Sequence, residues 1–199
     1  MTSTDLHSIP DLTGKSPALA GELPELTPFP ERGNRRPDLD AALTAFLTEE
    51  SAALDERRYS DWLDTLAELF IYQVPVPLLR EDPELPRHSE TALLFEATKN
   101  VLAMKVGRVG LHHAWSDRPG GAMRHFIGAV RVFDLPDPGA LRVDSNVLAT
   151  FSRGRDETEL ATAARQDIVT VTGDGYHLIR RRVLLDVEVA TWTQLSIIF

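Results

Sequence analysis

Residues 158–188 have the sequence TELATAARQDIVTVTGDGYHLIRRRVLLDVE, and they predict a long β-hairpin. Two strand-like runs, 158–172 and 176–188, flank the turn Gly173-Asp174-Gly175. Glycine in a short turn reaches the backbone angles that a tight connection between antiparallel strands needs. Each run is longer than the usual strand of about five or six residues. Strands of this length predict a sheet that is strongly bent rather than flat.

The other strands are predicted on both sides of this hairpin. Three runs, 122–134, 141–152 and 191–199, complete the C-terminal half. An earlier strand is predicted at 70–77, because apolar residues alternate along it. Pro75 and Pro77 fall inside that run, and proline cannot donate to the ladder of hydrogen bonds. We therefore expect the early strand to lie at a sheet edge or to end early.

Three helices are predicted in the N-terminal half. The first begins at Pro37-Asp38, ends near Arg58-Tyr59 and carries an apolar stripe formed by Leu39, Leu43, Phe46, Leu47 and Leu54. Its other face is expected to carry Glu49, Glu50, Asp55, Glu56 and Arg57. A shorter helix is expected after the N-cap Ser60, with Trp62, Leu63, Leu66 and Leu69 on its buried side. The third spans roughly Thr91 to Val106, ends at Gly107 and Gly110, and buries Leu94, Val101, Leu102 and Met104.

Helices followed by a series of strands are the α+β pattern. We expect a cone in which the N-terminal helices pack into a strongly curved, mostly antiparallel sheet, and this single domain covers residues 37–199. Residues 1–36 differ from it, since they hold Pro10, Pro17, Pro24, Pro28 and Pro30 without a sustained period. Such a segment predicts an arm without a core of its own, either disordered or draped over a partner subunit.

Composition excludes several classes of function. The 199 residues include no Cys, which excludes disulfides, a thiol nucleophile and thiolate-held iron–sulfur or zinc sites. The net charge of −9 argues against nucleic acid as a partner. No apolar run is long enough to span a bilayer, and the N-terminus has no secretion signal, so we expect a cytoplasmic protein. Phosphate-binding glycine loops and a GxSxG turn are absent as well.

The basic triplet Arg180-Arg181-Arg182 lies within one of the predicted strands. Alternation of side chains places Arg180 and Arg182 on one face of the sheet and Arg181 on the other. We expect ion pairing within the sheet or at a subunit contact, rather than a nucleic-acid site.

Four stretches, in order and covering about residues 39–199, resemble a known family. They are 54–59 (LDERRY) with Trp62, 72–76 (YQVPV), 114–119 (AWSDRP) followed by 124–132 (RHFIGAVRV), and 195–199 (LSIIF). This pattern is similar to the small β subunits of Rieske-type aromatic-ring-hydroxylating dioxygenases, which have the cone fold of the nuclear-transport-factor-2-like (NTF2-like) superfamily. Gly128, Gly120-Gly121 and Gln194 depart from the family's usual residues, which bears on substrate class and subfamily more than on the fold.

The resemblance implies a supporting role in the breakdown of aromatic compounds. In such enzymes the α subunit holds a Rieske [2Fe-2S] centre and a mononuclear iron. The β subunits form a trimer beneath the α subunits, giving an α3β3 heterohexamer. By resemblance, this chain binds no metal or other cofactor, has no catalytic residue, and acts on the α subunit through its surface.

Candidate metal ligands in the chain itself are few. His112 and His113 are adjacent, and neighbouring side chains of an extended segment point to opposite sides. With Asp117 they form a possible set of ligands, but hydrogen bonding in a loop is the plainer interpretation. His125 and His177 lie in predicted strands, where we expect packed or interface imidazoles.

The same architecture allows a different class of function. Enzymes of the ketosteroid-isomerase-like or SnoaL-like type use a carboxylate or a His–Asp pair as general base beside a tyrosine, inside the cone. The pocket residues for such a stand-alone lyase or isomerase would be Tyr59, Asp64, Tyr72 and His113. Asp64 is expected on the solvated face of its helix, and alternation alone leaves the directions of Asp144 and Asp167 open. We expect instead that bulky side chains fill the mouth of the cone: Phe46, Trp62, Phe70, Phe95, Leu102, Trp115, Phe126 and Trp192.

Overall fold

The computed structural model describes residues 28–82, 84–109, 121–152, 158–187 and 198–199. Helical segments are the 3-10 turn η1 (Pro37–Leu39), α1 (Asp40–Asp55), α2 (Tyr59–Asp64) and α3 (Lys99–Val109). The strands are β1 (Leu66–Pro77), β2 (His88–Thr98), β3 (Ala122–Asp134), β4 (Ala140–Ser152), β5 (Glu159–Thr172) and β6 (Gly175–Leu185).

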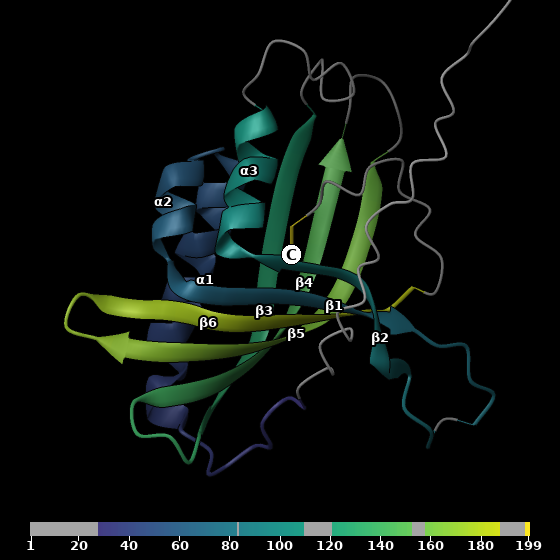
Figure 1. The fold of residues 1–199 in the computed structure, drawn as a ribbon, viewed down its shortest axis with the longest axis horizontal. Coiled ribbons are helices and arrows are strands. Elements are labelled where there is room, and N and C mark those ends of the chain that lie inside the picture. The colour runs from purple at the N-terminus through teal and green to yellow at the C-terminus, as the bar shows by residue number, and fades with distance from the viewer. Residues whose placement is uncertain (1–27, 83, 110–120, 153–157, 188–197) are drawn as a thin grey trace, which may run out of the picture.

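One six-stranded sheet forms the body of the fold, in the order β2-β1-β6-β5-β4-β3. Every neighbouring pair is antiparallel except β1 and β6, which run parallel. The sheet curls strongly, and α1, α2 and α3 cover its concave side (Figure 1). The expected α+β cone with a mostly antiparallel sheet is confirmed.

A β-bulge contributes to the bend of β3. The pairing of β3 with β4 shifts register between Gly128 and Arg131, and Ala129 has a φ of 51°. An extra residue in one strand of a pair bends that strand and increases its twist. The bulge therefore helps the long strand β3 to follow the curvature of the cone.

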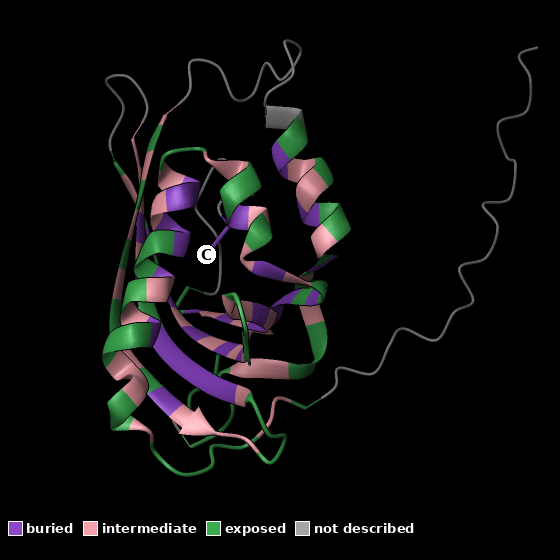
Figure 2. Ribbon diagram, turned by 90° about the vertical axis from the view of Figure 1, so that its left-hand side faces the viewer, coloured by how far each residue is buried: buried purple, intermediate pink, exposed green. Residues whose placement is uncertain are grey.

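Helix α1 packs its apolar stripe into the hollow of the sheet. Leu43 and Leu47 are fully buried, and they join a core that includes Val132 of β3 and Val143 of β4. Figure 2 shows buried residues on the side of each helix that faces the sheet. The first predicted helix is confirmed in position, and its stripe is the main contact between the helical layer and the sheet.

The third predicted helix is half wrong. Residues 88–98 form strand β2, which pairs antiparallel with β1, and the helix begins only at Lys99. Leu94 lies on β2 and is 50% exposed. Val101 and Met104 do lie in the helix, but they are 40% and 64% exposed rather than buried, whereas Leu102 is buried as expected. The helix also runs through Gly107 to Val109. Residues 91–98 (TALLFEAT) fit both the helical and the strand pattern of apolar residues, and pairing with β1 selects the strand.

Strand β1 is not at the edge of the sheet, which corrects a second expectation. It lies between β2 and β6, and its two prolines fall at register shifts near its end, which is Pro77. Irregular pairing is where a residue without an N–H is tolerated. Leu69 belongs to this strand rather than to the second helix, which ends at Asp64, and its side chain is 85% exposed.

The predicted hairpin joins β5 to β6, and its register pairs Asp167 with Arg181. Gly175, at the end of the turn, has a φ of 133°, which only glycine adopts readily. Arg181 points into the cone and is 1% exposed. The expected alternation along the triplet, and the expected ion pairing within the sheet, are therefore confirmed for Arg181.

The end of the proline-containing stretch lies on the outer face of this chain's own sheet. The Phe29 ring lies 5.1–5.2 Å from the guanidinium carbons of Arg142, Arg180 and Arg182. The main-chain N–H of Arg36 donates to the carbonyl of Val132 at 2.9 Å. Residues 28–36 are thus held by β3, β4 and β6, and the rest of the expected arm lies outside the described residues. So does most of the expected strand at 191–199, and its two described residues, Ile198 and Phe199, are not in a strand.

Candidate functional site inside the cone

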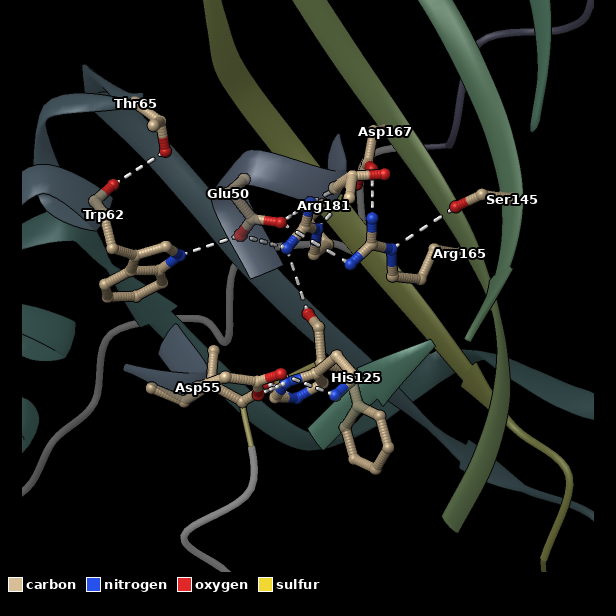
Figure 3. Close-up of polar contacts among 12 residues, drawn as sticks. Glu50, Asp55, Trp62, Thr65, His125, Ser145, Arg165, Asp167 and Arg181 are labelled. Carbon is tan, nitrogen blue, oxygen red and sulfur yellow. Dashed lines mark hydrogen bonds and ion pairs between the residues drawn. The ribbon is translucent and has the colours of Figure 1, made fainter. Parts of the chain in front are cut away.

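Four charged side chains meet in the interior of the cone. Glu50 comes from α1, Arg165 and Asp167 from β5, and Arg181 from β6, and each is 1% exposed or less. Residues 165 and 167 share the inner face of β5 because side chains alternate along a strand. Figure 3 shows the two guanidinium groups between the two carboxylates. Two positive and two negative charges leave the cluster formally neutral.

Arg181 is the centre of this cluster. Its Nε donates to Asp167 Oδ1 at 2.8 Å, and its Nη1 donates to Glu50 Oε1 at 2.8 Å. Burial works against ionising Glu50, but the charges of Arg181 and Arg165, with hydrogen bonds from Arg181 and Trp62, outweigh it and lower the Glu50 pKa to about 2. Glu50 is therefore a carboxylate at neutral pH. Its Oε1 also accepts a hydrogen bond of 2.7 Å from the Trp62 indole N–H.

Arg165 is held less tightly than Arg181. Its Nε lies 3.4 Å from Ser145 Oγ, and its Nη1 and Nη2 lie 3.7 Å from Glu50 and 3.8 Å from Asp167. Burial and the neighbouring Arg181 lower the pKa of Arg165 below its usual value. The pairing of Arg165 is therefore mainly coulombic, which suits a role in balancing charge more than in fixing geometry.

A second polar unit joins α1 to β3. Asp55 Oδ1 lies 2.7 Å from His125 Nδ1, and Asp55 Oδ2 accepts the His125 main-chain N–H at 3.0 Å. The side chains are 9% and 2% exposed. A neutral imidazole donates from one ring nitrogen only, whereas an imidazolium donates from both. A carboxylate fixed at Nδ1 would leave Nε2 as the atom that exchanges a proton with a bound molecule.

Residues 198–199 occupy the space between these two units. The Ile198 main-chain oxygen lies 3.0 Å from His125 Nε2, and the Phe199 main-chain oxygen accepts from Arg181 Nη1 at 3.1 Å. The Phe199 N–H donates to the Tyr72 hydroxyl at 3.1 Å. Both residues are buried, and the end of the chain lies in the hollow between helices and sheet in both views (Figures 1 and 2).

Tyr72 contributes its hydroxyl from β1, at the inner face of the sheet. Burial raises the Tyr72 pKa to about 12, against smaller effects of the Phe199 N–H and of Arg181 that lower it. The ring packs edge-on against Phe95, with centroids 6.0 Å apart. Tyr72 is thus a neutral hydroxyl at physiological pH that can accept from the chain and still donate.

Chemically, the interior contains the parts of a general acid–base site in a closed state. His125 oriented by Asp55, the Tyr72 hydroxyl and the Arg181 guanidinium could together bind and protonate a small molecule. In this structure the polar atoms that such a molecule would need are bonded to the main chain of residues 198–199. The arrangement therefore fills the interior with protein.

The alternative pocket residues named from the sequence are mostly elsewhere. Of the four, Tyr72 lies inside, Tyr59 is half-buried against the core, and Asp64 is exposed as expected. His113 lies outside the described residues, as do His112 and Asp117. Asp167 points inward, whereas Asp144 lies on the outer face with Arg142 and Arg32. Within the described ranges, no three His, Asp or Glu residues are placed to share a metal ion.

Sequence reasoning missed the centre of the site. Glu50 was expected on the solvated face of α1, and this is wrong, because Leu43, Leu47, Glu50 and Leu54 follow one another at steps of four, three and four. That spacing places residue 50 on the buried stripe. Asp55 was placed on the same solvated face, yet its side chain is 9% exposed and pairs with His125. The carboxylate on an apolar stripe was the signal that could have found the cluster.

The expectation that bulky apolar side chains fill the cone is only partly right. Trp62, Phe70 and Leu102 are buried, and Phe46 and Phe95 are partly buried against the core. The expectation is wrong for Phe126, which faces outward and is 58% exposed. Trp115 and Trp192 lie outside the described residues. Charged groups and the main chain of residues 198–199 supply much of the remaining filling.

A curled sheet closed by N-terminal helices around a filled interior defines an NTF2-like cone. Residues 49–191 match the family model described as "Ring hydroxylating beta subunit". The chain therefore belongs to the family of ring-hydroxylating dioxygenase β subunits. None of the helices in the described ranges has the length and apolar character that crossing a bilayer requires.

Individual relatives agree with the family match. The chain is 26% identical over 168 residues to the biphenyl 2,3-dioxygenase subunit beta of Rhodococcus jostii strain RHA1, covering 82% of this chain and 90% of that protein. A chain of naphthalene 1,2-dioxygenase with indole bound in the active site superposes with a TM-score of 0.72 at 23% identity, covering 81% and 86%. The benzoate 1,2-dioxygenase β subunit of Burkholderia mallei gives 0.59 at 20% identity, covering 73% and 89%.

Proposed function

We propose that this chain is the structural β subunit of an aromatic-ring-hydroxylating dioxygenase that acts in the breakdown of aromatic compounds. Family membership supplies the β-subunit role. The closed interior supports the structural part of the proposal, because His125 Nε2, the Tyr72 hydroxyl and Arg181 are all bonded to the main chain of residues 198–199. A polypeptide that fills its own cavity has only its surface with which to act.

The partner in this proposal is an α subunit that carries a Rieske [2Fe-2S] centre and a mononuclear iron. Names of relatives support it, since biphenyl 2,3-dioxygenase and benzoate 1,2-dioxygenase both have chains designated β subunits. This chain would bind no cofactor itself. It would form a trimer within an α3β3 heterohexamer in the cytoplasm. Residues 28–36 lie on this chain's own sheet, so only the part of the arm before residue 28 would drape over a neighbouring subunit.

A surface suited to such contacts lies on the outer face of β3, β4 and β5. Phe126 and Leu160 are 58% and 61% exposed there, on strands that flank Leu148 of β4. Next to them is a hollow of about 490 Å³ whose lining includes Phe126, Asn146 and Thr162. Large apolar side chains that cluster on a surface beside a hollow are typical of subunit contacts.

One observation favours a second candidate, a stand-alone lyase or isomerase of the SnoaL-like type. The Asp55–His125 pair and Tyr72 lie on the inner face of the cone, where such enzymes place a base and a hydroxyl. This candidate requires that residues 198–199 leave the interior, so that a substrate can reach His125.

Co-expression with a Rieske-type dioxygenase α subunit separates the two candidates. We expect the chain to co-purify with the iron-containing α subunit at about 1:1, in a particle whose mass corresponds to three copies of each. A chain that remains a monomer and shows no affinity for the iron protein would contradict the β-subunit proposal. Turnover of a small carbonyl compound by such a monomer would favour the isomerase.

A further inference from the structure

We propose that the inside of the cone is a peptide-binding site and that its occupant is the chain's own segment Ile198–Phe199. This inference goes beyond the β-subunit role and does not depend on it. It assigns a recognition function to groups that would otherwise count as core: the His125 imidazole, the Tyr72 hydroxyl and the Arg181 guanidinium.

The peptide group that joins Ile198 to Phe199 is held at both of its ends. Its carbonyl oxygen lies 3.0 Å from His125 Nε2, and its N–H donates to Tyr72 at 3.1 Å. The next main-chain oxygen, that of Phe199, accepts from Arg181 at 3.1 Å. Along the site, His125 and Arg181 supply donors and the Tyr72 hydroxyl between them supplies an acceptor. The main chain of Ile198–Phe199 offers the complementary groups in the same order: a carbonyl oxygen, an N–H and a second carbonyl oxygen.

The three groups come from parts of the chain that are far apart in sequence. His125 lies on β3, Tyr72 on β1 and Arg181 on β6, and Asp55 of α1 orients the imidazole. Each of these side chains is fixed by a partner other than the occupant: Asp55 for His125, Asp167 for Arg181, and the Phe95 ring for Tyr72. Groups fixed in advance lose little entropy when they bind a ligand.

Burial of the occupant matches this polar recognition. Ile198 is 8% exposed and Phe199 is 4% exposed, and both belong to the hydrophobic core. Two apolar side chains supply the affinity, and the three main-chain bonds supply the direction and register. The chemical class of ligand is thus a short peptide with two adjacent apolar residues, and Ile198–Phe199 are the described residues that provide it.

Binding of a labelled peptide to a proteolytically cleaved form of the full chain tests the proposal. A specific protease site is placed within residues 188–194, the folded protein is cleaved, and a fluorescent acetylated peptide of sequence LSIIF is added. We expect the labelled peptide to exchange with the cut segment and to bind saturably. Tyr72→Phe should weaken this binding about 5-fold, through loss of one hydrogen bond. Tyr176→Phe is the matched control, because it makes the same change in a tyrosine whose ring packs against Phe46, with centroids 5.7 Å apart.

A second measurement uses the uncut chain, so that the outcome does not depend on survival of the cleaved protein. Hydrogen exchange of the Phe199 amide should be slow in the unmodified chain and about 5-fold faster in Tyr72→Phe, with the Val183 amide unchanged. Equal exchange rates for the Phe199 amide in the two proteins would overturn the proposal. So would a cut chain that keeps its fold but neither retains its own segment nor binds the labelled peptide.

Discussion

Arg181 Nη1 of β6 donates a 2.8 Å hydrogen bond to Glu50 Oε1 of α1 in the interior of the cone, although the two residues are 131 positions apart in the sequence. The contact connects the helical layer to β6, one of the two strands of the parallel pair in the sheet. Both side chains are 1% exposed or less, so the bond is shielded from water. A buried ion pair adds little net stability compared with a well-packed apolar core, but removal of one partner is costly. Glu50 and Arg181 therefore fix how α1 sits in the sheet.

Replacing Glu50 by Gln should destabilise the chain strongly. The change leaves two buried guanidinium groups with Asp167 as their remaining carboxylate in the cluster. We expect a loss of about 3–5 kcal/mol in the free energy of unfolding, measured by urea denaturation. Glu49→Gln is the control, because Glu49 is exposed and pairs with Arg58 at the surface, and it should change stability by less than about 1 kcal/mol. Equal effects of the two changes would show that the cluster does not hold the fold.

Stability should fall in acid because of the same carboxylate. The pKa of Glu50 is lowered from 4.5 to about 2 in the folded chain, mainly by Arg181 and Arg165 against the cost of burial. A depressed carboxylate pKa contributes stability that is complete above pH 4.5 and is lost as the pH falls from 4.5 toward 2. Urea midpoints measured across this range should show a steeper acid loss in the unmodified chain than in Glu50→Gln. Parallel curves would contradict the assignment.

Replacing Asp55 by Asn should loosen the second polar unit. Asp55 accepts two bonds from His125, and asparagine can accept only through one oxygen. The expected loss is about 1–3 kcal/mol in the free energy of unfolding. Asp61→Asn is the matched control on the neighbouring helix, since Asp61 is exposed and pairs with Arg58. If both variants unfold at the same urea concentration, the Asp55–His125 pair contributes nothing beyond a surface contact.

Assembly should depend on the outer face of the sheet. Phe126→Ser combined with Leu160→Ser removes two exposed apolar side chains and should leave the fold of the isolated chain intact. We expect the double variant to lose association with its neighbours in analytical ultracentrifugation. Met104→Ser on α3 is equally exposed, at 64%, and should assemble normally. Full assembly of the double variant would remove this face from the proposed interface.

Local patterns predicted the strands well, because long alternating runs leave little ambiguity. The limits of β3, β4 and β5 differ from expectation by one residue at most. The third helix was placed too early, since residues 91–98 satisfy either period and the choice between them depends on pairing with distant β1. The expected edge position of β1 was wrong for a related reason: strand order depends on contacts between segments that are far apart in the sequence.

The site was harder to predict than the fold. Tyr72 was a candidate for the interior, but its partner is the main chain of Phe199, and a main-chain contact leaves no signature in the residue types. Asp167 and Arg181 face one another only because the hairpin register shifts by one residue between Ile168 and Val169. Counted from the turn at residues 173–175 alone, Asp167 would pair with Arg180, so the turn did not predict this contact. The Asp55–His125 pair brings together residues 70 positions apart, which no local pattern contains.

The most direct test of a supporting role is to measure iron content and aromatic hydroxylation for three samples: the isolated chain, the isolated α subunit, and the two combined with their electron-transfer partner. We expect all of the iron to be in the α subunit, no turnover by the isolated chain, and the highest turnover per iron in the combined sample. Stoichiometric iron in the isolated chain, or product formed by it without the α subunit, would contradict the proposed role.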